Sequence, residues 1–344
     1  MVDPRAGATA YPHLPEHDQV EVLRRVALAG AAHFGLQVRD LTLVLHGYNT
    51  TFRLDAGDGR RVALRVNTNS HSTLENIAAQ QAWCRAITSQ TDVRVPDPLA
   101  APDGSLVVAV DAIEVGCPVT VVANSWLEGN DVVRCSAEQA HELGRAMASL
   151  HVHSAEWSLT HGAGFPVFDE PLFGDEDLLR EHPSLTGAGG DLVEEARRRC
   201  CAAFSSAGAE ASAIALHADL HGGNLRWHEG ALAVFDFDDS GLGVPALDLA
   251  VATFYLRDGT REAVAVEAAL RAGYAGVTRL PDIDDDAFEG LVAARQLLLA
   301  NSLLVSSTSS LRSEAESYLD VTVQRLRRFL DTGRFTLAPE AGPQ

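Results

Sequence analysis

The chain has 344 residues, 46% of them apolar, and a formal net charge of −20. This charge argues against nucleic acid and anionic membranes as partners, because both repel an acidic protein. All 27 basic residues are arginines, which excludes mechanisms that need a lysine, such as a P-loop phosphate lysine or a Schiff base.

Neither the apolar segments nor the cysteines indicate a membrane span or an oxidising compartment. No run of about 18 apolar residues is present, so no membrane-spanning helix is expected. The five cysteines are odd in number and include no C-x-x-C pair, which favours reduced thiols over a disulfide framework. We therefore expect a cytoplasmic protein, and the sequence leaves its oligomeric state open.

The first third of the chain predicts a small, strand-rich lobe. Residues 1–16 are a polar leader, and apolar residues at helical spacing predict a helix over 17–35. The turn residues Asp55 to Gly59 are typical of a hairpin between two strands. A further helix is expected over 73–87, and strands are expected over 41–45, 51–54, 61–66, 105–110 and 119–123. Together these elements predict an N-terminal lobe over 17–124.

Beyond residue 124 the pattern is mostly helical. Ser136 is a candidate N-cap for a helix that runs to His151. Further helices are expected over 191–204, 246–257, 260–273, 284–305 and 312–331. The sequence therefore predicts an α+β protein in which a small lobe precedes a larger, mostly helical lobe over 125–344. A cleft between two lobes is a natural place for a ligand.

One polar motif in the second lobe carries chemical information. It reads His217-Ala218-Asp219-Leu220-His221-Gly222-Gly223-Asn224, and Val234-Phe235-Asp236 follows it. Apolar segments lead into both parts, so two strands would deliver the polar groups to one edge. Asn224 and Asp236 offer the oxygen ligands that Mg²⁺ prefers, with waters and phosphates as its other ligands. Asp219 can orient the proton of an attacking hydroxyl, and His217 supports the loop by hydrogen bonds rather than by titrating.

Other acidic and histidine clusters are weaker candidates. Asp236-Phe237-Asp238-Asp239-Ser240 resembles the first motif of haloacid-dehalogenase phosphatases, but that chemistry needs a downstream lysine and the chain has none. His151 and His153 have no third residue at a metal-ligand spacing, so a packing or surface role is expected for them. The motif around Asp219 is therefore the best candidate site.

The H-x-D-x-x-x-x-N spacing with a later Asp is that of phosphoryl-transfer enzymes. With the segment Val44 to Phe52 and with Asp248-Leu249-Ala250, it makes the chain resemble the aminoglycoside phosphotransferase and choline kinase family. The details after Asn224 are most similar to the branch of stress-response kinases and type II homoserine-kinase-like proteins. The resemblance implies a bilobal protein-kinase-like fold, with an antiparallel sheet in the small N-lobe and a larger helical C-lobe.

The resemblance also implies roles for the residues of the second lobe. Asp219 is the catalytic, base-like residue, with His217 beside it, and Asn224 and Asp236 are the Mg²⁺ ligands. Asp248 braces the catalytic loop; as an alternative it is the N-cap of the helix that follows. His221 is expected in a supporting position. Asp238 is an extra acid near the metal, which either supports the site or is a solvated residue of the hairpin.

In the first lobe the resemblance implies a nucleotide site. Arg65 takes the place of the third-strand lysine on the phosphates, and Asn49 and Thr50 belong to the turn that replaces a glycine-rich loop. Ser125 and Leu127 match the hinge whose backbone binds adenine. Gln80 stands where kinases have a Glu that pairs with the third-strand cation. We therefore expect Arg65 to pair either with Gln80 or with Glu75.

The predicted activity is phosphoryl transfer from ATP or GTP to a hydroxyl of a small molecule, assisted by Mg²⁺. The acceptor is expected to be a hydroxylated metabolite or antibiotic. The alternatives are a protein Ser/Thr kinase of the stress-response type, a homoserine- or choline-type metabolite kinase, and a nucleotide-binding regulator without catalysis. The intact set of Asp219, Asn224 and Asp236 argues against the regulator.

Overall fold

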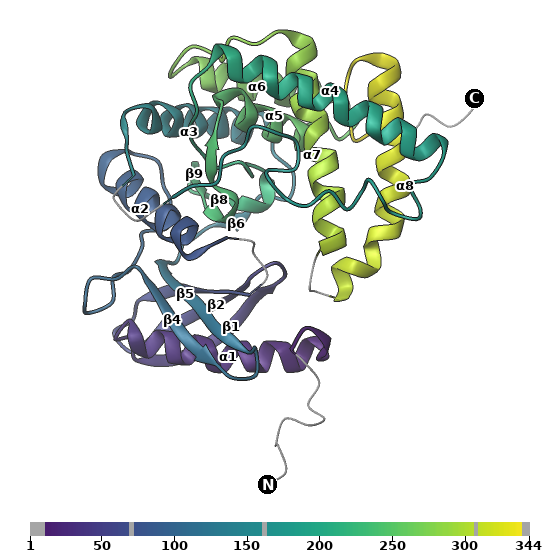
Figure 1. Cartoon of the computed structure of the whole chain (residues 1–344). Helices are drawn as coiled ribbons and strands as arrows, with labels where there is room; N and C mark the ends of the chain where they lie inside the picture. Colours follow the sequence, from purple (N-terminus) through teal and green to yellow (C-terminus); the bar gives the residue numbers. More distant parts are fainter. Residues whose placement is uncertain (1–10, 69–71, 160–163, 306–308, 339–344) are drawn as a thin grey trace. The chain divides into compact units, whose positions relative to one another are not determined.

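The computed structural model describes residues 11–68, 72–159, 164–305 and 309–338 (Figure 1). The chain divides into two compact units, each described by itself below. The first unit holds the residues up to Arg85 and Pro96–Trp126, together with a short segment at the start of the last helix. The second holds Ala86–Val95, Leu127–Val305 and the residues from Glu314 onward. The second unit thus takes Ala86–Val95 from within the N-terminal lobe expected over 17–124, and most of it follows Trp126.

The first unit is built on a five-stranded antiparallel sheet with the strand order β1-β2-β3-β5-β4. A helix, α1, lies against one face of this sheet (Figure 1). The elements are a 3₁₀ turn (Tyr11–His13), α1 (Glu16–His33), β1 (Val38–His46), β2 (Thr50–Ala56), β3 (Arg61–Asn67), α2 (Leu74–Gln90), β4 (Val107–Ala112) and β5 (Cys117–Ser125). The end of α2, from Ala86 onward, belongs to the second unit.

Alternation along the strands explains why α1 covers this face. In β2 every second residue is buried, including Phe52 and Leu54, while the residues between them are half-buried. These side chains pack with Leu23 and Ala27 of α1 in one apolar cluster. Gly30 lets α1 approach the sheet closely, since a Cβ there would lie 2.8 Å from a methyl carbon of Val121. The period-2 pattern of the strands and the helical pattern of α1 thus meet in one core.

The second unit is mostly helical and carries two small sheets. Its elements are β6 (Asn130–Asp131), α3 (Ala137–Glu156), α4 (Ala188–Glu210), β7 (Ile214–Leu216), η2 (Gly222–Asn224), β8 (Leu225–His228), β9 (Ala231–Val234), η3 (Phe237–Asp239), β10 (Gly241–Gly243), α5 (Pro245–Leu256), α6 (Ala263–Ala275), α7 (Asp285–Val305) and α8 (Ser309–Thr332). Ser136 is the N-cap of α3, as predicted, and forms a capping box with Gln139.

Glycines allow the helices of this unit to pack closely. A Cβ at Gly144 of α3 would overlap the carbonyl oxygen of Leu270, and one at Gly273 of α6 would overlap the carbonyl oxygen of His141. The contact between α3 and α6 is therefore made backbone against backbone. It fixes α3, which carries His151 toward the candidate site.

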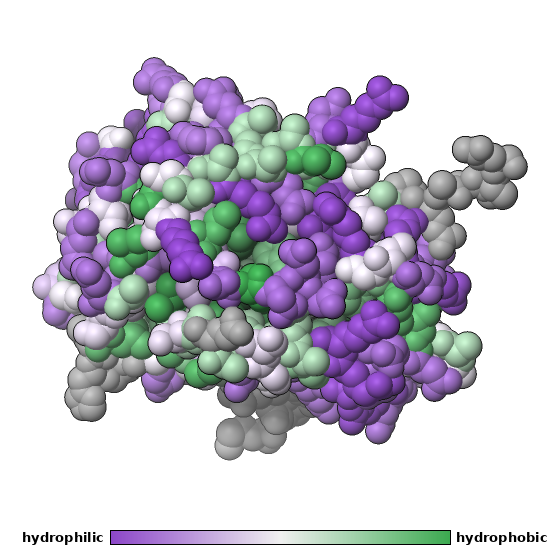
Figure 2. All heavy atoms as spheres, turned by 90° about the horizontal axis from the view of Figure 1, so that it is seen from above, coloured by the Kyte–Doolittle hydropathy of each residue, from purple (hydrophilic) through white to green (hydrophobic). Residues whose placement is uncertain are grey.

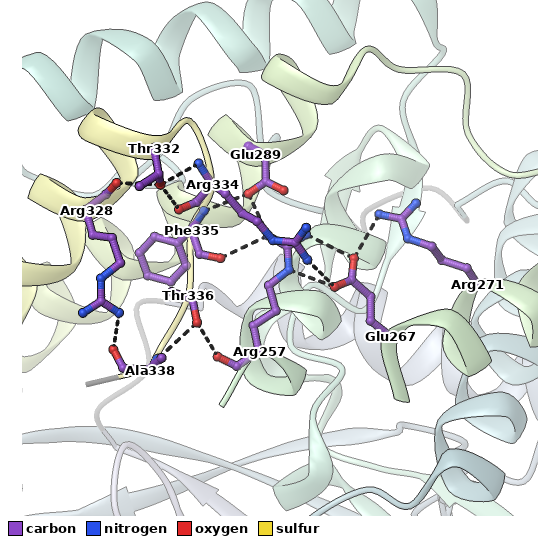
Figure 3. A network of polar contacts seen from close by, with 10 residues as sticks. All are labelled: Arg257, Glu267, Arg271, Glu289, Arg328, Thr332, Arg334, Phe335, Thr336 and Ala338. Atoms are coloured by element: carbon purple, nitrogen blue, oxygen red, sulfur yellow. Dashed lines mark hydrogen bonds and ion pairs between the residues drawn. The ribbon is translucent and has the colours of Figure 1, made fainter. Parts of the chain in front are cut away.

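A buried network fastens the C-terminal segment to the end of α5 (Figure 3). The guanidinium of Arg257 donates to Glu267 at 2.9 Å, to Glu289 at 2.7 Å and to the carbonyl oxygen of Phe335 at 3.1 Å. Only 6% of the Arg257 side chain is exposed, so its charge is balanced almost entirely by these partners. The network holds the end of α5 in place, two residues after Tyr255.

Helix α7 has the length and hydropathy of a helix that could cross a membrane. In this protein 67% of its apolar window is buried inside the structure, which is the pattern of a core helix. The protein surface has a different character: the face shown in Figure 2 is covered largely by hydrophilic residues, with apolar patches between them.

Candidate functional site

The predicted catalytic loop follows β7 and is held by a carboxylate behind it. Asp248 of α5 is fully buried and accepts hydrogen bonds from the backbone amides of His217 at 3.2 Å and Ala218 at 2.6 Å. The N-cap of α5 is Val244, so the alternative in which Asp248 caps this helix is wrong. The contacts of Asp248 are those of a brace for the loop.

A second buried residue supports the same carboxylate. Nε2 of His151, on α3, lies 2.9 Å from Asp248, and its Nδ1 lies 2.9 Å from the hydroxyl of Tyr274. Burial raises the pKa of Tyr274 to about 12, so the phenol stays protonated and donates to Nδ1. Nε2 then carries the ring proton and donates to Asp248. His151, expected in a packing role, thus extends the brace of the loop to α3 and α6.

Two residues of the site adopt a backbone conformation that is rare outside glycine. Ala218 and Asp236 both have φ of +62°, in the left-handed region where a Cβ crowds the backbone. Ala218 is fully buried and its amide is bonded to Asp248, so the surrounding contacts hold it there. Strained residues of this kind concentrate at functional sites, and these two directly flank Asp219 and the second acidic segment.

Asp219 is surrounded by donors on both carboxylate oxygens. Its Oδ1 forms an ion pair with Nη2 of Arg295, from the middle of α7. Its Oδ2 accepts from the amide of Asn224 at 2.8 Å and lies 3.3 Å from Nε2 of His221. Arg295 is only 4% exposed, and its Nε and Nη2 donate to the hydroxyl of Tyr255 at 3.3 and 3.0 Å.

These contacts set the charge state of the site. Burial alone would raise the pKa of Asp219, but the charge of Arg295 and the hydrogen bond from His221 outweigh it and hold that pKa below its usual range. Burial raises the pKa of Tyr255 to about 12. Asp219 is therefore an ionised acceptor, and Tyr255 is a neutral phenol beside a charged guanidinium.

The two predicted metal ligands lie next to each other. The amide nitrogen of Asn224 donates to the backbone oxygen of Asp219 at 2.9 Å as well as to its carboxylate. Both bonds use the NH₂ group, so the amide oxygen is the atom left for a cation. The backbone amide of Phe235 donates to the backbone oxygen of Asn224 at 3.0 Å, which brings Asp236 beside Asn224. Two oxygen donors fit Mg²⁺, which keeps waters and phosphates as its remaining ligands.

No group of three or more His, Cys, Asp or Glu residues suited to a metal occurs in the described parts of the chain. A metal held by protein side chains alone is thus not indicated there. Asn224 and Asp236 would supply one amide oxygen and one carboxylate to Mg²⁺, whose remaining ligands would come from outside the protein.

His217 and His221 differ in their surroundings. His217 is fully buried; its Nε2 lies 3.0 Å from the carbonyl oxygen of Phe235, and burial lowers its pKa. Its contacts are those of the loop support that we expected. His221 accepts from the amide of Gly223 through Nδ1 at 3.0 Å, so Nε2 carries the proton and points to Asp219. Its ring packs on Tyr255, with 4.4 Å between the centroids. Asp238 lies in η3, after Asp236.

The predicted nucleotide residues of the first unit lie on and around its sheet. Nη2 of Arg65, on β3, donates to Oε1 of Gln80, on α2, at 3.0 Å; this is one of the two pairings that the sequence left open. The side chains of the other predicted residues contact the backbone or a nearby side chain. Asn49 Oδ1 accepts from the backbone amide of Thr68 at 3.2 Å, and Thr50 Oγ1 lies 2.8 Å from His46 Nδ1. Ser125 Oγ accepts from the backbone amide of Asp97 at 2.8 Å. Leu127 belongs to the second unit.

Sequence reasoning missed Arg295 and Tyr255. Arg295 stands within the apolar run of α7, between Ala294 and Leu297. A charged residue on the buried stretch of a helix is rare unless it is paired, and this was the available signal. The sequence could not name its partner, because Asp219 lies 76 residues away.

Comparisons with known proteins identify the family of the chain. A model of the phosphotransferase enzyme family (APH) matches residues 40–280. The chain is 31% identical over 285 residues to an uncharacterised protein of Deinococcus radiodurans, covering 80% of this chain and 81% of that protein.

Solved structures of kinases share the fold. A microcompartment-associated aminopropanol kinase superposes with a TM-score of 0.76 at 24% identity, over 91% of this chain and 99% of that one. The amicoumacin kinase hAmiN superposes with a TM-score of 0.72 at 15% identity, over 94% of this chain and 98% of that one. The macrolide 2′-phosphotransferase MphH of Brachybacterium faecium superposes with a TM-score of 0.56 at 20% identity, over 86% of this chain and 98% of that one. The predicted kinase-like α+β fold is thereby confirmed, and the chain belongs to the phosphotransferase enzyme family and is a kinase.

Proposed function

We propose that this kinase transfers the terminal phosphoryl group of ATP or GTP to a hydroxyl of a small molecule. The observation that carries the proposal is the Asp219 carboxylate, held ionised at the end of a braced loop with Asn224 bonded to it. An ionised carboxylate in that position accepts a hydrogen bond from an acceptor hydroxyl and orients its oxygen for attack.

In this reaction a bond forms between the acceptor oxygen and the terminal phosphorus while the bond from phosphorus to the nucleoside diphosphate breaks. The hydroxyl proton passes to the Asp219 carboxylate, and the nucleoside diphosphate leaves with the electron pair. Mg²⁺ held by Asn224 and Asp236 would supply positive charge to the phosphate oxygens. We assign the phosphates to Arg65 and the base to the backbone at Ser125 and Leu127, with Asn49 and Thr50 in the turn between β1 and β2.

A small-molecule acceptor is supported by the relatives, whose names include kinases of aminopropanol, amicoumacin and macrolides. The acidic composition, with a net charge of −20, favours an acceptor that carries an amine. Amino alcohols and amino-bearing antibiotics are therefore the first compounds to test, followed by homoserine and choline.

The test is nucleotide consumption and phosphorylated product with this panel, measured for the wild type and for Asp219→Asn. We expect Asp219→Asn to lose turnover while it still binds nucleotide. Asp282→Asn is the matched control, since Asp282 is an exposed carboxylate paired with Arg279 on the surface, and it should keep full activity. Turnover retained by Asp219→Asn would overturn the assignment. Labelled phosphate found in the protein itself, with none in any acceptor, would favour a protein kinase instead.

A further inference from the structure

Arg295 is a buried cation placed against the proposed catalytic carboxylate by an element outside the motif. It lies in the middle of α7, with 4% of its side chain exposed. A buried ion pair is weak evidence for stability, because removing two charges from water costs about as much as their attraction returns. A role in the chemistry is a better account of why this position carries an arginine.

The hydrogen bonds of Arg295 leave one arm of the guanidinium available. Nε and Nη2 donate to the hydroxyl of Tyr255, and Nη2 also reaches Asp219. Nη1 makes no hydrogen bond to any residue in the described ranges, and it is not among the fully enclosed polar atoms that lack a partner. An arginine has five N–H donors in a rigid fork, so Nη1 presents two of them to a ligand.

The position of Asp219 indicates which ligand comes near. An acceptor hydroxyl lies about 2.6–3.2 Å from the carboxylate that orients it, and reacting atoms approach to about 3–3.5 Å. The transferred phosphorus therefore comes within roughly 6 Å of the carboxylate that Arg295 contacts. A guanidinium bonded to that carboxylate is within reach of the phosphoryl oxygens.

Several carboxyl groups lie around Asp219, and a cation beside them reduces their mutual repulsion. The carboxyl group of Asp239 lies within electrostatic range of those of Asp219, Asp236 and Asp238, so four carboxyl groups gather in this part of the second unit. The groups that stabilise the Asp219 charge are Arg295 and two histidines. Phosphoryl transfer spreads negative charge over three equatorial oxygens, and an arginine supplied by the same chain can stabilise it. The chain has no lysine to do so.

We propose that Arg295 is a catalytic residue whose Nη1 donates to the transferred phosphoryl group while Nη2 stays on Asp219. This inference rests on the proposed phosphotransferase function. Arg295 keeps all its protons during the step: the hydroxyl proton goes to Asp219, and the electron pair of the broken bond goes to the nucleoside diphosphate. Tyr255 acts as a positioning residue that holds the guanidinium in this orientation.

The test uses a mimic of the transferring phosphoryl group, so the acceptor need not be known. Binding of MgADP, and of MgADP with aluminium fluoride, is measured by calorimetry for the wild type, Arg295→Met and Arg295→Lys. We expect Arg295→Met to bind the fluoride complex roughly 10- to 100-fold more weakly, as for a lost charge-assisted hydrogen bond, and MgADP alone with unchanged affinity. Arg295→Lys should recover part of the loss. Arg279→Met, at an exposed position, is the control and should bind like the wild type.

A second comparison separates direct contact from an effect through Asp219. Asp219→Asn is compared with the double variant Asp219→Asn/Arg295→Met. The double variant has lost both charges of the pair, so no charge is left without its partner. It can therefore be measured even if Arg295→Met does not fold. A contact to the phosphoryl group predicts that the double variant still loses affinity for the fluoride complex. Equal affinities in this pair would overturn the proposal and leave Arg295 acting only through Asp219.

The remaining outcomes are also decisive. A wild type that binds MgADP but gains nothing from fluoride would overturn the proposal, because a preorganised guanidinium predicts that gain. A wild type that binds no nucleotide would instead contradict the proposed function on which the inference rests. Tyr255→Phe keeps both charges and should weaken the fluoride complex less than Arg295→Met does.

Discussion

Asp219 and Arg295 stand 76 residues apart in the chain and form an ion pair within the second unit, with 17% and 4% of their side chains exposed. The pair joins the proposed catalytic loop to α7, and Tyr255 adds the end of α5. The loop is therefore held from two sides: by Asp248 at its backbone and by Arg295 at its functional carboxylate. Each contact leads to a measurable expectation.

Breaking the ion pair from one side should destabilise the fold. Arg295→Met leaves the Asp219 carboxylate, which is 17% exposed, without its main partner. Since breaking a fully buried pair costs about 3–5 kcal/mol, we expect a loss of about 3 kcal/mol here. Removing both charges in Asp219→Asn/Arg295→Met should recover a large part of that loss, because no unpaired charge stays behind. Urea unfolding of the three variants and the wild type measures this. A double variant no more stable than Arg295→Met would contradict the explanation.

Asp248→Asn should damage the loop more than the charge change suggests. The Asp248 carboxylate accepts from two backbone amides and from His151, whereas an Asn has only one acceptor oxygen and brings an NH₂ group toward other donors. One buried donor then goes unpaired, at a cost of about 1–3 kcal/mol. We expect a lower melting temperature and a fall in turnover with nucleotide affinity retained. Unchanged turnover would show that the brace is dispensable.

The sequence predicted much of this arrangement because the signals for it are local. The helix and strand periods predicted α1, the strands β2 and β3 and the long helices within a few residues of their ends. The motif predicted that Asp219 and Asn224 lie together, because their spacing lies within one turn of chain; the catalytic role of this loop stays a prediction. The bracing role of Asp248 came from family resemblance and was left open against a capping role, which only the observed start of α5 decided.

The parts that could not be predicted depend on contacts between distant elements. Arg295 belongs to a helix whose pattern says only that it is buried, and nothing in that pattern selects Asp219 as its partner. His151 had no metal-ligand spacing and was assigned to packing; its hydrogen bond to Asp248 required α3 and α5 to be placed together. The sequence also gives no signal for the left-handed backbone conformation of Ala218, because alanine does not favour that conformation.

Stability should fall in acid through His217. Burial lowers the pKa of His217 in the folded protein, whereas in the unfolded chain it returns to about 6.5. Below that pH His217 is protonated in the unfolded state but stays neutral in the folded state, so the free energy of unfolding decreases as the pH falls. Above about pH 7.5, one unit over the unfolded pKa, both states are neutral at this position and the contribution is constant. Melting temperatures between pH 5 and 8 should fall more steeply for the wild type than for His217→Gln, and parallel curves would contradict this.

Two substitutions at Asp236 distinguish the effect of its charge from the effect of its backbone conformation. Its φ of +62° is tolerated better by Asp and Asn than by Ala. Asp236→Asn should therefore keep the stability of the wild type but need more Mg²⁺ for half-maximal turnover, since it loses a charged ligand. Asp236→Ala should lose the ligand in the same way and in addition be less stable, by about 1 kcal/mol, from the left-handed strain. Magnesium titrations give the first quantity and chemical unfolding the second. If the two variants were equally stable, the backbone at this position would not be strained, and the αL conformation would carry no meaning for the site.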